Sequence, residues 1–297
     1  MKVAITGSHG LVARHLIPAL ERAGHQVRPV VRGNPGAGEL HWDPAADELD
    51  RAALDVDAVV HLAGVGIASK RWNDEHKRQL LTSRVDGTTL LATALAAATT
   101  KPAVFVSASA VGYYGDRGDE ECSESTASGR DFLSELCRQW ERSTEAASAA
   151  GIRTVCLRTG VVQAADGGAL RPQLPLFKLG LGGRLGDGRQ WVSWIAIDDE
   201  VGAILHALGD ERVRGPVNLT APEPVRNSSY TQTLGRVLGR PAVLAVPAPA
   251  LRVALGREMA DELLLISQKV TPGVLSATGY DWRQPALEPA LRSLLGR

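Results

Sequence analysis

The N-terminal stretch MKVAITGSHGLVARHL most constrains the fold, because a short apolar strand pattern leads through a glycine loop into a helix pattern. Three interpretations of the loop compete. A P-loop needs Gly-Lys-Ser/Thr at its end, whereas Leu11, Val12 and Ala13 follow Gly10 here. An ordinary turn would use the two glycines for positive φ. The third interpretation, a loop that cradles a dinucleotide pyrophosphate, is favoured because the loop follows a buried strand and opens a helix.

In the dinucleotide interpretation each loop position has a physical role. Gly7 permits the tight turn, and Gly10 lets a pyrophosphate approach the backbone at the positive end of the helix. Ala13 stands where a third glycine is usual and still gives the small side chain that helix-to-sheet packing needs. Ser8 is a candidate phosphate contact, and we interpret His9 as an exposed turn residue.

The first half of the chain repeats the strand and helix alternation. Five short β-branched runs lack the polar alternation of a half-exposed sheet, which is typical of strands buried on both faces. These runs cover residues 3–6, 26–31, 58–63, 103–108 and 153–158, with helical patterns over 11–23, 74–98 and 130–149. The pattern predicts an α/β protein with a Rossmann-type, doubly wound parallel sheet.

The end of the second predicted strand indicates which dinucleotide binds. Sites that prefer NAD place Asp or Glu there for the ribose 2′-hydroxyl, whereas a 2′-phosphate needs a cation. The sequence VRPVVRGNPG has no carboxylate and offers Arg28 and Arg32. Arg32 stands at the end of the strand, and a guanidinium binds phosphate in a bidentate manner. We therefore predict NADP(H) as the cofactor, with Arg28 as a solvated charge.

The composition of the chain changes after Thr159, where glycine-rich segments without a regular strand or helix pattern begin. We predict an NADP-binding Rossmann core over 1–160 and a mixed region over 161–297. In that region, about 165–196 and 221–297 form a small, mostly helical substrate lobe, and about 197–220 return a helix and a strand to the core. Residues 191–208 predict a short strand and then a helix capped by Asp198 or Asp199. Residues 228–239 predict a helix that ends at a glycine.

Composition excludes several classes of partner. Thirty-three basic residues balance thirty-three acidic ones, so no global field favours nucleic acid or an anionic membrane, and any affinity for anions must be local. Cys122, Cys137 and Cys156 form no C-x-x-C pair and cannot all be matched in disulfides. With no signal-peptide pattern or membrane-spanning run, we expect a cytoplasmic protein without a metal, membrane or nucleic-acid partner. The oligomeric state stays open.

Four motifs in order, VAITGSHGLVARHL, VVHLAGVGI, SRVDGTTLLATAL and VFVSASAVGYYG, resemble an extended-type short-chain dehydrogenase/reductase of the NAD(P)-dependent epimerase/dehydratase superfamily. The segments AGVGIASKRWN, WERSTEAA and LPLFKLGLGGRLGDGRQWVSWIAIDD are similar to its atypical branch of sugar-nucleotide-epimerase-like "epimerase family" proteins. The resemblance covers essentially the whole chain. It implies bound NADP, with cofactor contacts at Gly7, Gly10, Arg32, Leu62, Ala63, Arg84 and Val162. We add Leu11, Val12, Gly64 and Ser107 to this candidate cofactor site.

The resemblance also implies a catalytic relay of Tyr, Lys, Ser and Asn, which this chain largely lacks. Ser109 stands at the serine position, but Leu133 and Cys137 stand where Tyr and Lys would fall. Arg84 replaces the asparagine. Leucine transfers no proton and a thiol does not replace a fixed ammonium, so we predict that the standard mechanism is absent. Cys137 is then a small core residue.

Tyr113 and Tyr114 follow the serine strand and are the candidate replacements, with Arg84 as a cation able to lower a tyrosine pKa. The alternative is that both tyrosines pack with satisfied hydroxyls. In GRQWVSW, the side chains Gln190, Trp191 and Trp194 are either a substrate wall or packing anchors. Ala196 stands where the family resemblance implies a histidine, so no such side chain acts here.

Three functions remain open from the sequence. The first is an NADP(H)-binding epimerase or oxidoreductase-like enzyme with a non-standard site, acting on an unknown small molecule such as a nucleotide sugar or another carbonyl or hydroxyl compound. The second is a non-catalytic NADP(H)-binding sensor or regulatory protein. The third is a sugar-nucleotide binder with a structural cofactor. Fold alone does not choose among them.

Overall fold

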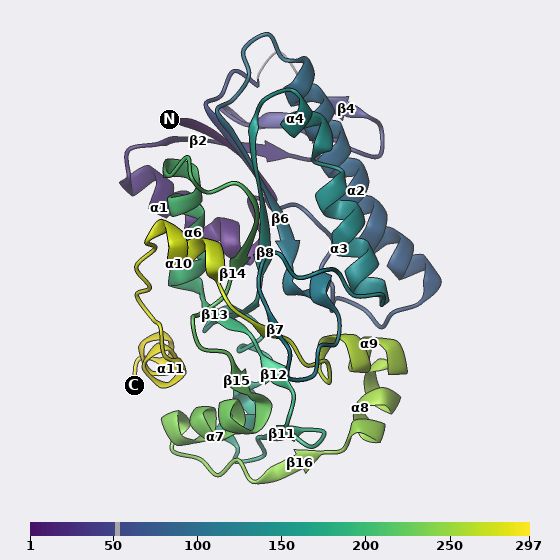
Figure 1. The fold of residues 1–297 in the computed structure, drawn as a ribbon, viewed down its shortest axis with the longest axis vertical. Coiled ribbons are helices and arrows are strands. Elements are labelled where there is room, and N and C mark those ends of the chain that lie inside the picture. Colours follow the sequence, from purple (N-terminus) through teal and green to yellow (C-terminus); the bar gives the residue numbers. More distant parts are fainter. Residues whose placement is uncertain (51–53) are drawn as a thin grey trace. The chain divides into compact units, whose positions relative to one another are not determined.

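The computed structural model describes residues 1–50 and 54–297 and contains two compact units (Figure 1). Unit 1 comprises residues 1–109, 136–157 and 201–217. Unit 2 comprises residues 110–135, 158–200 and 218–297. Each unit is therefore assembled from three separate stretches of chain.

The sheet of unit 1 has eight strands in the order β14-β8-β6-β5-β1-β2-β3-β4. β1 pairs in parallel with β2 and β5, and β5 pairs in parallel with β6. This order confirms the doubly wound sheet, in which the chain begins in the middle and winds out to both edges. The strands are β1 (Lys2–Thr6), β2 (Gln26–Val31), β3 (Leu40–Asp43), β4 (Glu48–Leu49), β5 (Ala58–His61), β6 (Val104–Ala110), β8 (Arg153–Thr159) and β14 (Gly215–Leu219).

Helices cover both faces of this sheet, as the buried strand runs require. Figure 1 shows α1 (Leu11–Arg22) and α6 (Ile197–Gly209) on one side and α2 (Asp74–Ala97), α3 (Phe132–Arg142) and α4 (Glu145–Ala149) on the other. The Asn73 side chain caps α2 by accepting from the backbone N–H of His76 at 2.7 Å. The helix expected over 130–149 is two helices, α3 and α4.

The edge strand β4 and its neighbour β3 have no counterpart among the five predicted runs. Leu40 and Trp42 alternate with half-buried neighbours in β3, and the Trp42 ring lies 5.6 Å from the ring of His61 in a T-shaped arrangement. Two apolar residues in a four-residue run are too weak a signal to separate a strand from a loop.

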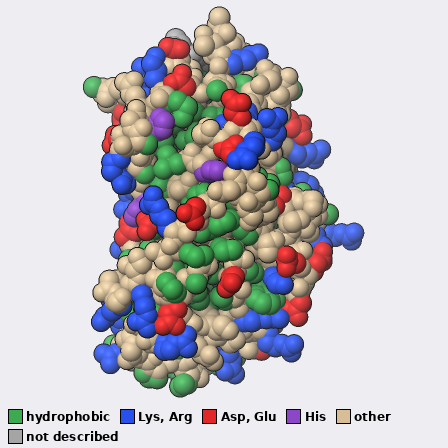
Figure 2. Space-filling view, turned by 60° about the vertical axis from the view of Figure 1, so that its left-hand side comes forward, with side chains coloured by type: hydrophobic (Ala, Val, Ile, Leu, Met, Phe, Trp, Pro, Cys, Tyr) green, Lys and Arg blue, Asp and Glu red, His purple; other side chains and the backbone are tan. Residues whose placement is uncertain are grey.

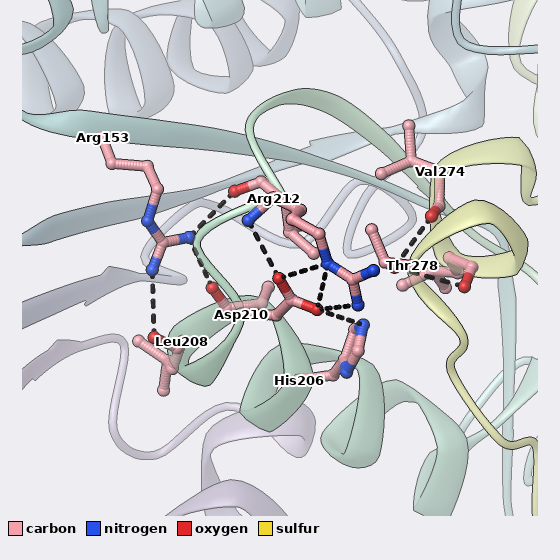
Figure 3. A network of polar contacts seen from close by, with 10 residues as sticks. Arg153, His206, Leu208, Asp210, Arg212, Val274 and Thr278 are labelled. Carbon is pink, nitrogen blue, oxygen red and sulfur yellow. Dashed lines mark hydrogen bonds and ion pairs between the residues drawn. The ribbon is translucent and has the colours of Figure 1, made fainter.

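Arg153, at the start of β8, satisfies the carboxyl end of α6 (Figure 3). Its guanidinium donates to the carbonyls of Ala207 and Val213 at 2.7 and 2.9 Å and to that of Leu208 at 3.0 Å. A cation at this position complements both the unpaired carbonyls and the helix dipole. In the turn that follows, Arg212 donates to Asp210 at 2.6 Å and lowers the pKa of Asp210 to about 2.

Unit 2 is built from four small sheets and short helices around a core that includes Leu170, Phe177, Trp194 and Tyr230. Its strands are β7 (Glu121–Cys122), β9 (Val161–Ala164), β10 (Gly167–Gly168), β11 (Gly183–Leu185), β12 (Trp191–Val192), β13 (Trp194–Ala196), β15 (Val225–Arg226), β16 (Leu244–Val246) and β17 (Lys269–Val270). Its helices are η2 (Val111–Tyr114), α5 (Leu174–Lys178), α7 (Asn227–Leu238), α8 (Ala248–Leu255), α9 (Arg257–Leu263), α10 (Gly273–Thr278) and α11 (Leu287–Leu295).

Two boundaries show how well local signals locate helix ends. α7 ends at Leu238, and Gly239 follows at a φ of 64°, as the predicted glycine end requires. α6 begins at Ile197, so Asp198 and Asp199 lie in its first turn and neither is the cap. Asp199 accepts from Tyr280 and from the backbone of Arg283 and Gln284, a tertiary role that no local pattern reveals.

Across the described residues, no helix has the length and apolar character needed to cross a bilayer.

Candidate functional site

The glycine loop follows β1 and leads directly into α1. Gly7 has a φ of +70°, and a Cβ there would lie 2.8 Å from the backbone of Leu62, so only glycine fits. The N–H of Gly10 donates to the carbonyl of Gly7 at 2.8 Å. Gly10 is exposed and is the N-cap of α1, with no side-chain cap hydrogen bond. The first N–H groups of α1 therefore face a position open to an anion.

Strand register brings the other cofactor candidates of unit 1 to the same edge. Thr6 pairs with Val30 on β2 and with His61 on β5, and His61 pairs with Ser107 on β6. The glycine loop, Arg32 and the turn 62–64 thus follow three adjacent strands at one level. Arg32 is exposed and forms no ion pair within the described part of the chain. Ser107 is fully buried, and its hydroxyl donates to the carbonyl of Ala108 at 3.3 Å.

Thr6 and His61 hold this edge together, and sequence reasoning missed both. The Thr6 hydroxyl oxygen accepts from the N–H groups of Leu62 and Ala63 at 3.2 and 3.3 Å. Both lone pairs are then used, so its proton goes to His61 Nδ1 at 2.7 Å. His61 must carry its own proton on Nε2. Burial, with the nearby charge of Arg84, lowers the pKa of His61 to about 3, so the ring is neutral.

Arg84 lies beneath the turn after β5. Its guanidinium donates to the carbonyls of Leu80 and Val65, each at 3.0 Å, and stacks 5.0 Å from the ring centre of Trp140. A Cβ added at Gly64 would lie 3.4 Å from the Arg84 guanidinium carbon. Burial lowers the pKa of Arg84. The side chain therefore fixes the 62–65 turn and supplies a buried positive charge below it.

The residues at the positions that the resemblance assigns to the relay include Ser109, Leu133 and Cys137. The Ser109 hydroxyl donates to Glu141 Oε1 at 2.7 Å, a partner that sequence reasoning did not identify. Leu133 is buried, and Cys137 is buried on α3 close enough to Arg84 for the two to interact electrostatically. Both side chains have the burial expected of core residues.

The two candidate tyrosines of unit 2 differ in their environment. Tyr114 is fully buried, and its hydroxyl donates to Asn218 Oδ1 at 2.6 Å and accepts from Arg158 at 3.0 Å. Burial raises the pKa of Tyr114 to about 12. Tyr113 is half-buried, and its ring lies 3.5 Å from the Arg158 guanidinium carbon. Arg158, which the sequence reasoning did not single out, is thus a cation in contact with both rings.

The remaining candidates of unit 2 have mainly packing contacts. Val162 is half-buried on β9 and pairs with Ile195, while buried Gln190 donates to the carbonyls of Leu185 and Leu264. Trp194 is fully buried and its indole donates to the carbonyl of Glu223. Trp191 is half-buried and donates to Asp119, and Arg226 lies 4.0 Å from its ring.

A buried carboxyl group on α6 is a further feature without a sequence signal. Thr159 donates to Glu200 Oε1 at 2.8 Å, and Oε2 has no hydrogen-bond partner among the described residues. Desolvation raises the pKa of Glu200 to about 8. The group is therefore a neutral acid at pH 7.

Comparison with known families identifies this arrangement. The model of the "NAD dependent epimerase/dehydratase family" matches residues 3–219. The chain belongs to this family. A second model, described only as a domain of unknown function (DUF1731), matches residues 246–294.

Relatives within the epimerase/dehydratase family cover nearly the whole chain. An epimerase family protein of Mycobacterium bovis is 46% identical over 97% of this chain and 96% of its own length. The human epimerase family protein SDR39U1 is 37% identical over 99% of this chain and 100% of its own length. These relatives confirm the branch to which the sequence motifs pointed.

Solved structures agree with the family assignment. The crystal structure of human SDR39U1 (isoform 2) with NADPH has a TM-score of 0.93 at 36% identity and covers 100% of this chain and 99% of its own. A nucleoside-diphosphate sugar epimerase of Corynebacterium glutamicum has a TM-score of 0.83 at 39% identity, covering 100% of this chain and 58% of its own. MoeE5 in complex with UDP-glucose and NAD shares the fold at 20% identity, with a TM-score of 0.78.

Proposed function

We propose that the chain binds NADP(H) on unit 1 and is an epimerase or oxidoreductase-like enzyme with a non-standard active site. The observation that carries the cofactor assignment is the exposed Arg32, which directly follows β2 at the same edge as the glycine loop. A strand end without a carboxylate and with a free guanidinium suits a 2′-phosphate. The NADPH held by the human relative supports this proposal.

The residues present fit the cofactor. The uncapped amides of α1, with Gly7, Ser8, Gly10, Leu11 and Val12, would hold the pyrophosphate. Arg32 would hold the 2′-phosphate, and the turn at Leu62, Ala63 and Gly64 would pack on the adenosine half. Ser107 and Arg84 are further proposed contacts, whereas Val162, which lies in unit 2, stays a prediction from the family resemblance. When bound, the nicotinamide supplies hydride transfer.

Ser109 and Tyr113 are the side chains that we propose for substrate. Because Ser109 gives its proton to Glu141, its oxygen keeps two lone pairs that can accept from a substrate hydroxyl. Tyr113 is the better of the two tyrosine candidates for proton donation. Its hydroxyl makes no hydrogen bond among the described residues, whereas that of Tyr114 both donates and accepts.

Titration of Arg32→Ala with NADPH and NADH tests the cofactor assignment. Loss of a charge-assisted contact should cost about 2 to 3 kcal/mol, or roughly 30- to 150-fold in Kd, for NADPH only. Arg28→Ala is the matched control, because Arg28 lies inside β2 opposite Ala4. Equal NADPH affinity in wild type and Arg32→Ala would exclude the 2′-phosphate role.

A non-catalytic NADP(H) sensor is the second candidate, favoured by the buried Leu133 and Cys137 at the Tyr and Lys positions. Cofactor-loaded protein should be assayed against carbonyl compounds and nucleotide sugars, the class named for the corynebacterial relative. Steady turnover that Tyr113→Phe abolishes supports the enzyme. Absence of turnover across the panel, with cofactor bound, supports the sensor.

A further inference from the structure

An exposed aliphatic patch lies on unit 2 and uses none of the residues assigned above. We define it as the leucine patch, whose members are between 47% and 79% exposed: Leu176, Leu179, Leu181, Val243 and Leu244. Most monomer surfaces scatter such residues singly, and a gathered set marks a contact surface.

Backbone contacts join the two segments that form the leucine patch. The N–H of Leu181 donates to the carbonyl of Leu176 at 2.9 Å, and Gly183 on β11 pairs with Leu244 on β16. A Cβ at Gly180 would lie 3.4 Å from the Pro241 ring. The patch is therefore continuous across residues more than 60 positions apart in sequence.

The two chain segments that supply the leucine patch carry charge of one sign. Residues 167–186 contain three Lys/Arg and residues 224–257 contain five, and neither segment contains Asp or Glu. The whole chain has 33 basic and 33 acidic residues, so these two segments are more basic than the chain as a whole. Four of the eight pair with acids elsewhere in unit 2: Arg226, Arg236, Arg252 and Arg257. The other four form no ion pair in the described part of the chain: Arg171, Lys178, Arg184 and Arg240.

Three of these unpaired cations border the leucine patch directly. Lys178 lies between Leu176 and Leu179 in sequence, and Arg240 donates to its carbonyl at 3.0 Å. Arg184 pairs with Ala245, the neighbour of Leu244. Figure 2 shows Lys and Arg side chains predominating at the lower end of the view, where Figure 1 places α7, β11 and β16.

An occupant of this surface must offer both apolar contact and negative charge. A second copy would bring like charges together, and single-stranded nucleic acid would use aromatic stacking, whereas the exposed residues are all aliphatic. Protein hot spots favour Trp and Tyr, with Leu and Val under-represented. Anionic headgroups attract Lys and Arg, and the acyl boundary accepts aliphatic side chains. We propose that the leucine patch docks on the surface of a bilayer that contains anionic phospholipid.

Vesicle co-sedimentation of the full chain tests the proposal. Vesicles of phosphatidylcholine with about one-third phosphatidylglycerol should bind the protein at low salt, and pure phosphatidylcholine should not. Salt at about 0.5 M should release it, because the Debye length falls to a few ångströms. Lys178→Gln should weaken binding about fivefold, whereas Lys101→Gln, an exposed lysine of unit 1, should leave it unchanged.

Two variants of Leu179 test the contribution of the aliphatic side chains to vesicle binding. Leu179→Ser should weaken binding about tenfold and Leu179→Met should restore it, with unchanged thermal melts because Leu179 is 73% exposed. No binding to anionic vesicles, equal binding to neutral ones, or equal effects of Lys178→Gln and Lys101→Gln would overturn the proposal. A concentration-dependent dimer that Leu179→Ser dissociates would also overturn it, by assigning the patch to a second copy.

Discussion

At the scale of single residues, the buried carboxyl group of Glu200 should make the stability of the fold depend on pH. Glu200 keeps its proton in the folded chain up to a pKa of about 8, whereas an unfolded glutamate releases it near 4.5. The folded state thus binds more protons than the unfolded state between these values. Its free energy of unfolding must fall as pH rises through this window, by up to about 1.4 kcal/mol per pH unit.

Glu200→Gln should remove this pH dependence. The amide oxygen still accepts from Thr159, so the variant keeps the hydrogen bond and loses only the titration. We expect its stability relative to wild type to grow by a few kcal/mol between about pH 5 and pH 8, as urea unfolding measures. Glu211→Gln, at an exposed position, is the control. Parallel pH profiles for wild type and Glu200→Gln would contradict the buried neutral acid.

At the scale of elements, the junction of β1 with the turn after β5 links stability to cofactor binding. The fully buried Thr6 hydroxyl bonds to the fully buried His61 and to the N–H groups of the half-buried Leu62 and Ala63. Its loss leaves the buried His61 Nδ1 without this partner, which costs about 1 to 3 kcal/mol, and releases two half-buried N–H groups that water can reach.

Thr6→Val should therefore destabilise the fold by about 1 to 3 kcal/mol and also weaken NADPH binding, because the 62–64 turn loses its anchor. Thr6→Ser keeps the hydroxyl and should retain both properties. Denaturant unfolding and NADPH titration of the two variants check this expectation. A Thr6→Val protein with wild-type stability would show that other contacts hold the turn.

Sequence patterns predict the elements well where the signal is local. The buried β-branched runs give β1, β2, β5, β6 and β8, and Gly239 marks the end of α7. They fail where the decisive partner is distant. Glu141 beside Ser109 and Arg158 beside Tyr113 belong to elements separated by more than thirty residues in sequence from their partners. Only the fold reveals such pairs, since no spacing rule joins them.

At the scale of the whole molecule, the fold follows the epimerase/dehydratase family. Residues 3–219 match the family, and the strand order agrees with the resemblance seen in the motifs. By contrast, the Leu133 and Cys137 side chains, at the positions that the resemblance assigns to Tyr and Lys, are buried in this fold. The local charge of the leucine patch is hidden in a chain whose total charge is zero.

The route of the chain between the two units has a consequence for any attempt to dissect the protein. The chain passes from one unit to the other after residues 109, 135, 157, 200 and 217. A fragment that stops at residue 160 lacks β14, the edge strand of the sheet, and the whole of α6. Neither unit can therefore be excised or exchanged as one continuous segment. An insertion or circular permutation that keeps both units intact must preserve five connections between them, not a single linker.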